Sequence, residues 1–421
     1  MAAAACWDEL PDDILRCIQG RLPCPIDTVY MGACCKSWHK AVPKPAARLM
    51  VLPWLLMPLA GGPSFGCILS GGACHNLDLL PEDARGARFF GSYEGKWLFA
   101  ALCGGGREGH TLLNLCTGER IPLPDFEYGL VFWAVRSTAH LGLFNIRGLP
   151  SPTLVRGPPR PVVMLAATLS SPPTVDGACV AAAILNMPRT NRWPFVCFWR
   201  LGSPVAVEGE DINTAPGTAA QDLAYLDGRF FVLTKGEHLR AYTALDEPDP
   251  LRGGDLRVVC DFYITGRDRQ LQAGEPRAGY LVPSRGELLM VVKEWRRTDG
   301  AAAAVQLFVL TPVAHDNPEK TRAWTRVESL DGRLLVVGPG CSRAYERTGC
   351  DEGVYFLDDR TYYHRNSFGA YFTLRSDPGE FVFADNGRCG LPPAHPEHCF
   401  PVKPDEEGCS SSYSPPVWLL P

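Results

Sequence analysis

Tyr225-Leu-Asp-Gly-Arg-Phe-Phe-Val combines a polar turn with an apolar run, and the chain repeats this pattern. The same order of a glycine turn, a basic residue and apolar residues occurs in Tyr93-Glu-Gly-Lys-Trp-Leu-Phe and Ser329-Leu-Asp-Gly-Arg-Leu-Leu-Val. Looser copies are Ser284-Arg-Gly-Glu-Leu-Leu-Met and Val175-Asp-Gly-Ala-Cys-Val. Short apolar runs separated by glycine, proline and aspartate turns are typical of β-strands. From about residue 65 onward the sequence therefore predicts an all-β domain.

A second strand follows several copies, as in Leu112-Leu-Asn-Leu-Cys-Thr-Gly, His238-Leu-Arg-Ala-Tyr and Val305-Gln-Leu-Phe-Val-Leu. Strand pairs that recur at intervals of tens of residues predict the blades of a β-propeller, in which each four-stranded sheet buries its faces against its neighbours. The spacing is irregular, so a β-sandwich with ordinary hairpins remains the alternative. In a propeller, we expect the strand around Val417-Trp-Leu-Leu to close the ring with the first blade.

The start of the chain has a different, helical character. Pro11 suits the first helical position, and the acidic residues Asp12 and Asp13 match the positive end of a helix. Pro23 ends this helix, and Gly20 weakens its last turn. Further short helices are expected over residues 26–33 and 35–42. One side of the first helix is apolar and carries Leu10, Ile14, Leu15, Cys17, Ile18 and Leu22.

Three short helices cannot enclose a full core. We therefore expect apolar residues such as Leu15 and Trp38 to be covered by the following domain or by a partner.

The opening and closing motifs of residues 7–47 together resemble an F-box. The opening is Leu10-Pro11 with spaced aliphatic residues, Asp27 is the acidic residue after the turn, and Cys34-Cys-Lys-Ser-Trp38 is the closing motif. The chain departs from the pattern at Met31-Gly32-Ala33 and at Cys34, where the family usually has valine. The alternative is an ordinary amphipathic helix at the edge of a domain. The resemblance implies a surface for a Skp-type adaptor, built or supported by Leu10, Pro11, Ile14, Leu15, Ile18, Leu22 and Trp38.

The remaining chain is similar to the plant F-box proteins that carry a propeller-like domain of unknown function. The segments that carry this resemblance are residues 52–58, 85–98 and 113–124, Gly340-Cys-Ser-Arg with residues 353–359, and residues 415–421. The chain departs from that family at Leu115-Cys116. The expected fold is mainly β with a small α-helical N-terminal module: an F-box at 7–47, a Pro-rich linker at 48–64 and an irregular β-propeller-like domain at 65–421.

The two resemblances imply the substrate-recognition subunit of a cullin-based ubiquitin ligase, with a Skp-type adaptor, cullin and an unknown protein target as partners. Such a subunit acts by proximity, so no catalytic residue, cofactor or metal is expected. One rival is an F-box module that binds its adaptor without directing degradation. The other is a propeller hydrolase with acidic or histidine groups around its channel.

Composition narrows the class of protein further. The chain has 421 residues, a net charge of −5 and 46% hydrophobic residues, which is a globular composition without a concentrated basic face for nucleic acid. No basic and apolar leader is expected at the start, and the apolar stretch 49–60 is too short and proline-rich to span a membrane. The 17 cysteines are scattered and predict reduced thiols. The expected compartment is the cytosol or the nucleus.

Three motifs suggest chemistry and are better explained by structure. Gly62-Pro-Ser64-Phe-Gly66 matches a nucleophile elbow, but Pro63 occupies the turn and the following residues indicate a strand. Gly104-Gly-Gly-Arg-Glu-Gly lacks the Lys-Ser/Thr of a phosphate loop and is expected to be a hairpin connection. A third group has residue types that bind metals and comprises Cys389, His395, His398, Cys399 and Cys409. It lacks the closely paired spacing of zinc ligands.

Large aromatic residues remain ambiguous between a ligand groove and blade interfaces. They include Trp97, Trp133, Trp193, Trp199 and Tyr225.

Overall fold

The structure is a computed structural model of the whole chain. It describes residues 7–22, 24–41, 52–59, 62–69, 74–75, 77, 79–102, 109–124, 163–173, 178–186, 194–203, 206–209, 219–247, 256–264, 277–295, 302–312, 322–346, 352–359, 381–382, 386–390, 397–400, 410–411 and 414–421.

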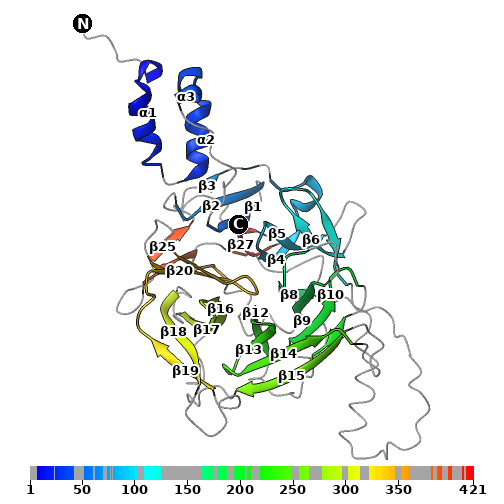
Figure 1. Cartoon of the computed structure of the whole chain (residues 1–421). Coiled ribbons are helices and arrows are strands. Elements are labelled where there is room, and N and C mark those ends of the chain that lie inside the picture. Colours follow the sequence, from blue (N-terminus) through cyan, green and yellow to red (C-terminus); the bar gives the residue numbers. More distant parts are fainter. Residues whose placement is uncertain are drawn as a thin grey trace, which may run out of the picture.

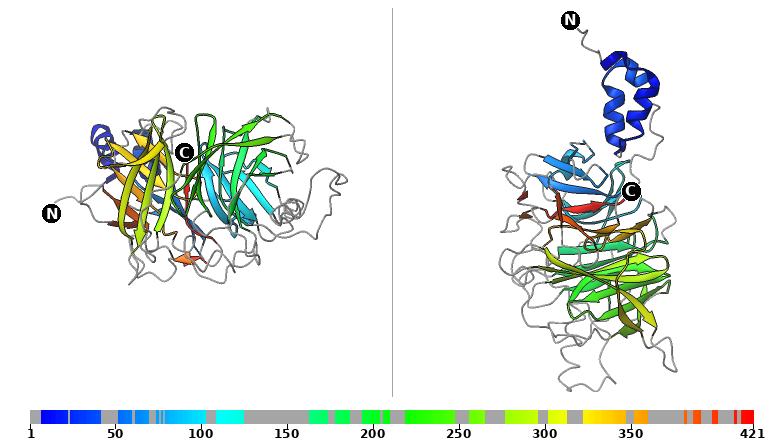
Figure 2. Two further views of the ribbon diagram at one scale, coloured as in Figure 1. Left: turned by 90° about the horizontal axis from the view of Figure 1, so that it is seen from below. Right: turned by 90° about the vertical axis from the view of Figure 1, so that its left-hand side faces the viewer.

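The N-terminal part is a helical module, residues 7–41, that projects from the rim of a ring of sheets (Figures 1 and 2). It consists of η1 (Trp7–Glu9), α1 (Asp12–Gln19), α2 (Pro25–Ala33) and α3 (Lys36–Ala41). Pro11 is the residue before α1 and not its first helical residue, so the prediction was wrong by one position. Helix α1 ends at Gln19, with Gly20 as its C-cap. None of the helices in the described part of the chain is long and apolar enough to cross a membrane.

The strands form six sheets of four or five strands that follow one another around a common centre in chain order (Figure 1). We call these sheets blades 1 to 6. This arrangement is a six-bladed β-propeller, which confirms the predicted fold class and excludes the β-sandwich. A further pair, β23 (Phe381–Val382) with β26 (Ser410–Ser411), lies outside the six blades.

The first three blades carry these strands, given from the edge nearest the centre outward. Blade 1 is β27 (Val417–Leu419), β1 (Trp54–Leu59), β2 (Gly62–Cys67) and β3 (Cys74–His75). Blade 2 is β4 (Arg88–Tyr93), β5 (Trp97–Leu102), β6 (Gly109–Asn114) and β7 (Arg120–Pro122), preceded by η2 (Glu82–Ala84). Blade 3 is β8 (Val163–Leu169), β9 (Val180–Asn186), β10 (Phe195–Arg200) and β11 (Val207–Glu208).

The other three blades complete the ring. Blade 4 is β12 (Ala220–Leu226), β13 (Arg229–Thr234), β14 (Leu239–Leu245) and β15 (Arg257–Ile264). Blade 5 is β16 (Arg277–Ser284), β17 (Glu287–Trp295), β18 (Ala302–Pro312) and β19 (Arg322–Val327). Blade 6 has the order β21 (Arg343–Glu346), β20 (Arg333–Val337), β22 (Gly353–Phe356), β24 (Asn386–Cys389) and β25 (Glu397–Phe400), with β20 and β22 parallel.

The repeated turn motifs form tight turns at the start of blade hairpins. In the hairpin β12–β13, Asp227 and Gly228 have φ of 48° and 80°. Arg285 and Gly286 between β16 and β17 have φ of 53° and 74°. Two successive positive φ values match the type I′ turn, whose twist suits a right-handed hairpin. The polar-Gly motif therefore recurs because this turn favours glycine and small polar residues at these positions.

The last strand closes the ring, as predicted. Strand β27 pairs antiparallel with β1, with Trp54 opposite Leu419. The buried indole of Trp418 donates a hydrogen bond to the Val337 carbonyl of blade 6 at 3.0 Å. The backbone N–H of Gly95 in blade 2 donates to the Pro421 carbonyl at 2.7 Å. Residues 417–421 thus join blade 1 to both of its neighbours.

The predicted linker over residues 48–64 was wrong in its second half, because this segment contains β1 and the start of β2. Strand β1 is buried along almost its whole length, so it has no polar alternation that would reveal a strand in the sequence. The propeller therefore begins by Trp54 and not at residue 65.

Candidate functional site

The helical module has its own small core. Leu15 is buried together with Met31 and Ala41. The Trp38 indole donates a hydrogen bond to the Trp7 carbonyl at 2.8 Å. The expectation that Leu15 needs cover from another domain was wrong, because the three helices bury this side chain themselves, whereas Trp38 packs against their core and stays partly exposed. Four other members of the set predicted to build or support the adaptor surface pack around this core, namely Leu10, Ile18, Leu22 and Trp38.

The remaining two predicted residues, Pro11 and Ile14, lie on the surface of the module. Ile14 is 44% exposed. At about 100° per residue, Ile14 lies roughly 100° from the buried Leu15, whereas Ile18 lies only about 60° from it, so Ile14 is turned further from the module's core. The structure thus divides the predicted set into core residues and surface residues, a division that the one-sided apolar pattern does not reveal.

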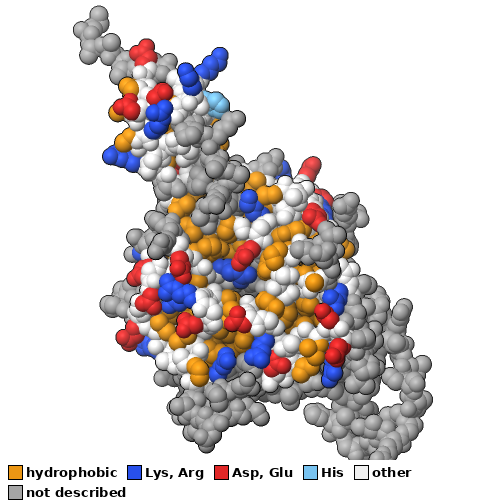
Figure 3. All heavy atoms as spheres, in the orientation of Figure 1, with side chains coloured by type: hydrophobic (Ala, Val, Ile, Leu, Met, Phe, Trp, Pro, Cys, Tyr) orange, Lys and Arg blue, Asp and Glu red, His pale blue; other side chains and the backbone are white. Residues whose placement is uncertain are grey.

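Every large hydrophobic residue that is exposed in the described part of the chain lies in this module. Besides Ile14 these are Trp7, 72% exposed, with Val29 and Tyr30 on α2. Figure 3 shows the module as a projection that carries apolar, acidic and basic side chains side by side. Sequence reasoning did not single out Trp7, Val29 and Tyr30 as exposed residues.

Met31, one of the residues at which the sequence departs from the F-box pattern, has a structural role. It is almost fully buried in the module's core. Methionine is unbranched and flexible, so it fills irregular space between short helices.

The centre of the propeller contains a buried carboxylate that links three blades. Asp222 on β12 accepts hydrogen bonds from the backbone N–H of Leu281 at 2.6 Å and of Gly340 at 2.7 Å. These donors lie in blades 5 and 6. Burial raises the pKa of Asp222 from 3.8 to about 7, although the backbone hydrogen bonds act in the opposite direction. The Asp222 carboxylate thus links blade 4 to blades 5 and 6 through these hydrogen bonds.

A second buried polar group lies between blades 5 and 6. The Lys293 ammonium donates to the Leu357 carbonyl at 2.6 Å and lies 3.7 Å from the Asp359 carboxylate. The Tyr280 hydroxyl donates to Asp359 at 2.5 Å. Burial raises the pKa of Asp359 to about 6, opposed by the charge of Lys293. Since these side chains are all buried, the arrangement fastens two blades together and offers no open face to a substrate.

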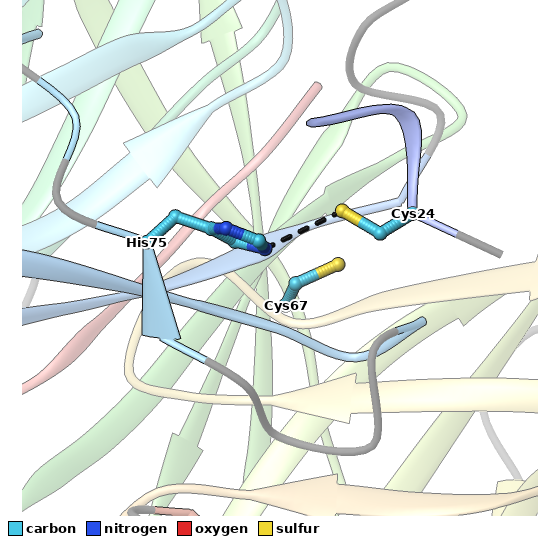
Figure 4. A group of neighbouring side chains, drawn as sticks. All are labelled: Cys24, Cys67 and His75. Atoms are coloured by element: carbon cyan, nitrogen blue, oxygen red, sulfur yellow. Dashed lines mark hydrogen bonds between the residues drawn. The ribbon is translucent and has the colours of Figure 1, made fainter. Parts of the chain in front are cut away.

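Three metal-ligand side chains meet where the helical module joins blade 1. Cys24, Cys67 and His75 have ligand atoms that all lie within 4.8 Å of one another. The Cys24 sulfur lies 3.4 Å from His75 Nε2 and points toward the imidazole, and the Cys67 sulfur lies beside this pair (Figure 4). Sequence reasoning missed this group because the residues are far apart in the chain, whereas zinc sites are recognisable in a sequence by closely paired ligands. We call this group the junction triad.

The other chemical motifs have these outcomes. Ser64 lies within β2, opposite Met57 of β1, so the segment is a strand and not a nucleophile elbow. The glycine-rich segment beginning at Gly104 lies largely outside the described residues, between the paired strands β5 and β6. In the predicted metal cluster, Cys389 is buried on β24 and packs in the propeller core. The side chains of the other four residues of that cluster are outside the described part of the structure.

The aromatic residues that can be placed support the blade interfaces. Trp97 and Trp199 are buried in a core cluster formed by blades 2 and 3. Tyr225 packs against the core of the later blades. Trp133 and Trp193 lie outside the described residues.

Comparison with known proteins identifies the propeller. The family model described as the KIB1-4 beta-propeller matches residues 70–372. Among solved structures, the Myceliophteria thermophila Cps50 (Swd1) beta-propeller domain is similar at 12% identity and a TM-score of 0.29, over 70% of this chain and 86% of that chain. Such a likeness carries no functional argument. None of the curated proteins compared with the chain matches it. Because the family match covers more than half of the sequence, the chain belongs to the KIB1-4 beta-propeller family.

Proposed function

We propose that the protein is the substrate-recognition subunit of a cullin-based ubiquitin ligase. In this proposal the helical module is an F-box that binds a Skp-type adaptor, and the propeller binds a target protein. The observation that carries the proposal is the distribution of exposed hydrophobic side chains. In the described part of the chain, all the large ones lie on the projecting module.

Contiguous exposed apolar patches mark surfaces for partners, and the concentration of the exposed large hydrophobic residues on one small module supports such a surface there. The module has a core of its own, so its surface residues are not exposed merely because it is unfolded or incomplete. The Leu10-Pro11 opening and the Cys34-Cys-Lys-Ser-Trp38 closing motif support an F-box as the kind of module. Pro11 and Ile14 are the members of the predicted set that are available to an adaptor.

The mechanism is proximity and requires no covalent step by this chain. A target held on the propeller has its lysines at high effective concentration near the charged conjugating enzyme. This requires a stiff connection between module and propeller. Cys24 and Ile26, at the start of α2, pack in the same core cluster as Trp54 and Phe65 of blade 1, which supports such a connection. The proposal assigns the protein to the cytosol or nucleus and leaves the target to the propeller's surface loops.

Binding of a purified Skp-type adaptor tests the proposal. Ile14→Asp places a charge on the expected apolar contact, and we expect the adaptor's dissociation constant to rise at least about tenfold. Ile14 is preferable to Leu10 because Leu10 also packs on the module's core, so its truncation would alter folding as well as binding. The measurement is calorimetric titration of the adaptor into each full-length protein.

The matched control is Arg326→Ala on β19, an exposed residue of blade 5 whose loss changes the net charge by the same amount. This variant should bind the adaptor as the wild type does. Equal binding by Ile14→Asp and the wild type would contradict the proposal. Recovery of the adaptor without cullin in a co-purification would instead favour an adaptor-binding module that does not direct degradation.

A further inference from the structure

We propose that the junction triad is a binding site for a zinc ion that fastens the helical module to blade 1. The ligands would be the thiolates of Cys24 and Cys67 and the Nε2 atom of His75. This site is independent of whether the module binds an adaptor, and it goes beyond the function proposed above.

The residue types fit zinc. Thiolate and imidazole are the ligands of protein zinc sites, and a Cys₂His set whose fourth position is taken by water or another ligand is among the known arrangements. Neither carboxylates nor carbonyl groups belong to the triad, so magnesium and calcium are poor candidates.

The spacing also fits. Zinc lies about 2.3 Å from sulfur and about 2.0 Å from nitrogen, so tetrahedral geometry separates neighbouring sulfur and nitrogen ligands by roughly 3.6 Å. The Cys24 sulfur lies 3.4 Å from His75 Nε2. All three ligand atoms lie within 4.8 Å of one another, so small side-chain movements suffice to enclose an ion (Figure 4).

Burial separates a metal site from a catalytic Cys–His pair. The exposed fractions are 0% for Cys24, 1% for Cys67 and 5% for His75. A nucleophilic cysteine must be reached by a substrate, whereas a structural metal site is enclosed. The rings of Trp54 and Tyr30 lie 5.4 Å and 6.0 Å from the His75 ring and contribute to this enclosure.

The three ligands come from both parts of the molecule. Cys24 is the N-cap of α2, whose positive helix end favours a negative thiolate. Cys67 is the last residue of β2, and His75 lies on β3 opposite Phe65 of β2. A metal bound here would therefore cross-link the module to the outer strands of blade 1 and limit its swing relative to the propeller.

The test is zinc binding by the full-length protein under reducing conditions. Elemental analysis of the purified wild type should find one zinc ion per chain. The affinity of the chelator-stripped protein is then measured by competition with a chromophoric chelator. We expect Cys24→Ser, Cys67→Ser and His75→Gln each to weaken zinc binding by roughly 100-fold or more. Cys197→Ser, which alters a buried cysteine on β10, should retain wild-type affinity.

Cobalt substitution provides a readout that does not depend on variants that fold poorly. Wild-type protein loaded with Co²⁺ should show thiolate-to-cobalt charge-transfer absorption and the visible bands of a tetrahedral ion. A wild type without zinc and without these bands would overturn the proposal. So would triad variants that bind zinc as tightly as Cys197→Ser, or a metal-free chain recovered with Cys24 and Cys67 joined in a disulfide.

Discussion

At the scale of single residues, Gly340 brings the backbone of blade 6 very close to that of blade 3. Its φ is +69°, and a Cβ atom placed on it would lie 2.6 Å from the Ala167 carbonyl oxygen of blade 3. Its N–H is one of the two backbone groups bound by Asp222. The turn after β20 thus reaches across the centre of the ring, and only glycine permits this approach.

Gly340→Ala should lower the free energy of unfolding by about 3 kcal/mol or more, from backbone strain plus a clash with backbone atoms. Gly118 is a matched control, because it also has a positive φ, +72°, but nothing within 4 Å of the added Cβ. Gly118→Ala should cost only about 1 kcal/mol. Urea unfolding of both variants measures the difference. Equal losses would mean that close packing at Gly340 does not matter.

Asp222 gives the propeller a pH-dependent stability. Its pKa is raised in the folded state, so the folded protein holds this proton more tightly than the unfolded chain. The resulting stabilisation is fully present below pH 3.8 and is lost as the pH rises to about 7. Relative to Asp222→Asn, the wild type should therefore lose up to about 4 kcal/mol of unfolding free energy between these limits.

The measurement is urea unfolding of both proteins at several pH values. The amide that replaces the carboxyl group in Asp222→Asn has a single acceptor oxygen, so it keeps only one of the two backbone hydrogen bonds. The variant should therefore be less stable than the wild type at every pH. The prediction is tested by how the difference in unfolding free energy between the two proteins changes with pH. A difference that stays constant with pH would contradict the raised pKa. Asp359 titrates in both proteins, but its charge contributes to the raised pKa of Asp222, so its titration cancels from the comparison only in part.

At the scale of elements, the strand β27 carries the closure of the ring. Its backbone completes blade 1, while Trp418 reaches blade 6 and Leu420 accepts a hydrogen bond from Lys96 of blade 2. A propeller that is open at this point would expose the apolar faces of three blades. The closing strand is therefore expected to stabilise the whole domain and not only its own blade.

Deletion of residues 415–421 should lower the free energy of unfolding by more than roughly 5 kcal/mol, enough to unfold a domain of ordinary stability. Trp418→Ala is a milder version with an expected loss of about 3–5 kcal/mol. Trp7→Ala, which removes an exposed indole of the module, should leave the propeller's melting temperature unchanged. An unchanged melting temperature after the deletion would show that β27 does not close the ring.

The elements that could be predicted from the sequence are those whose conformation is determined by residues close together in the chain. The polar-Gly turns, the closing strand and the three short helices each depend on a few adjacent residues. Strand β1 was missed because it is apolar on both faces and contains a proline, which suggested a linker. The junction triad was missed for a different reason: Cys24 and His75 are brought together only by the packing of α2 on the β2–β3 hairpin.

The surface that we propose for an adaptor could be predicted only in part, again for a physical reason. The apolar stripe of α1 identifies Leu15 and Ile14 together, because both differ from the polar face. Which of them is covered depends on α2 and α3, and above all on Met31 and Ala41, which pack on Leu15. A one-helix pattern cannot contain that information.

At the scale of the whole molecule, the projecting module and the ring have different surfaces. The propeller's blades bury their large apolar side chains between one another, whereas the module retains several on its surface. The module also stands clear of the ring (Figure 2), so a partner of considerable size can reach it without touching blades 2 to 6. This division predicts that an adaptor binds the module alone.

The claim that an adaptor binds the helical module alone is tested most directly by hydrogen-exchange mass spectrometry of the full-length chain, with and without a Skp-type adaptor. Binding should slow exchange in peptides from residues 7–22 and 24–41, which hold the exposed hydrophobic residues, and should leave blades 2 to 6 unchanged. An adaptor that protects no peptide of the helical module, or that protects only the propeller, would contradict the proposed function.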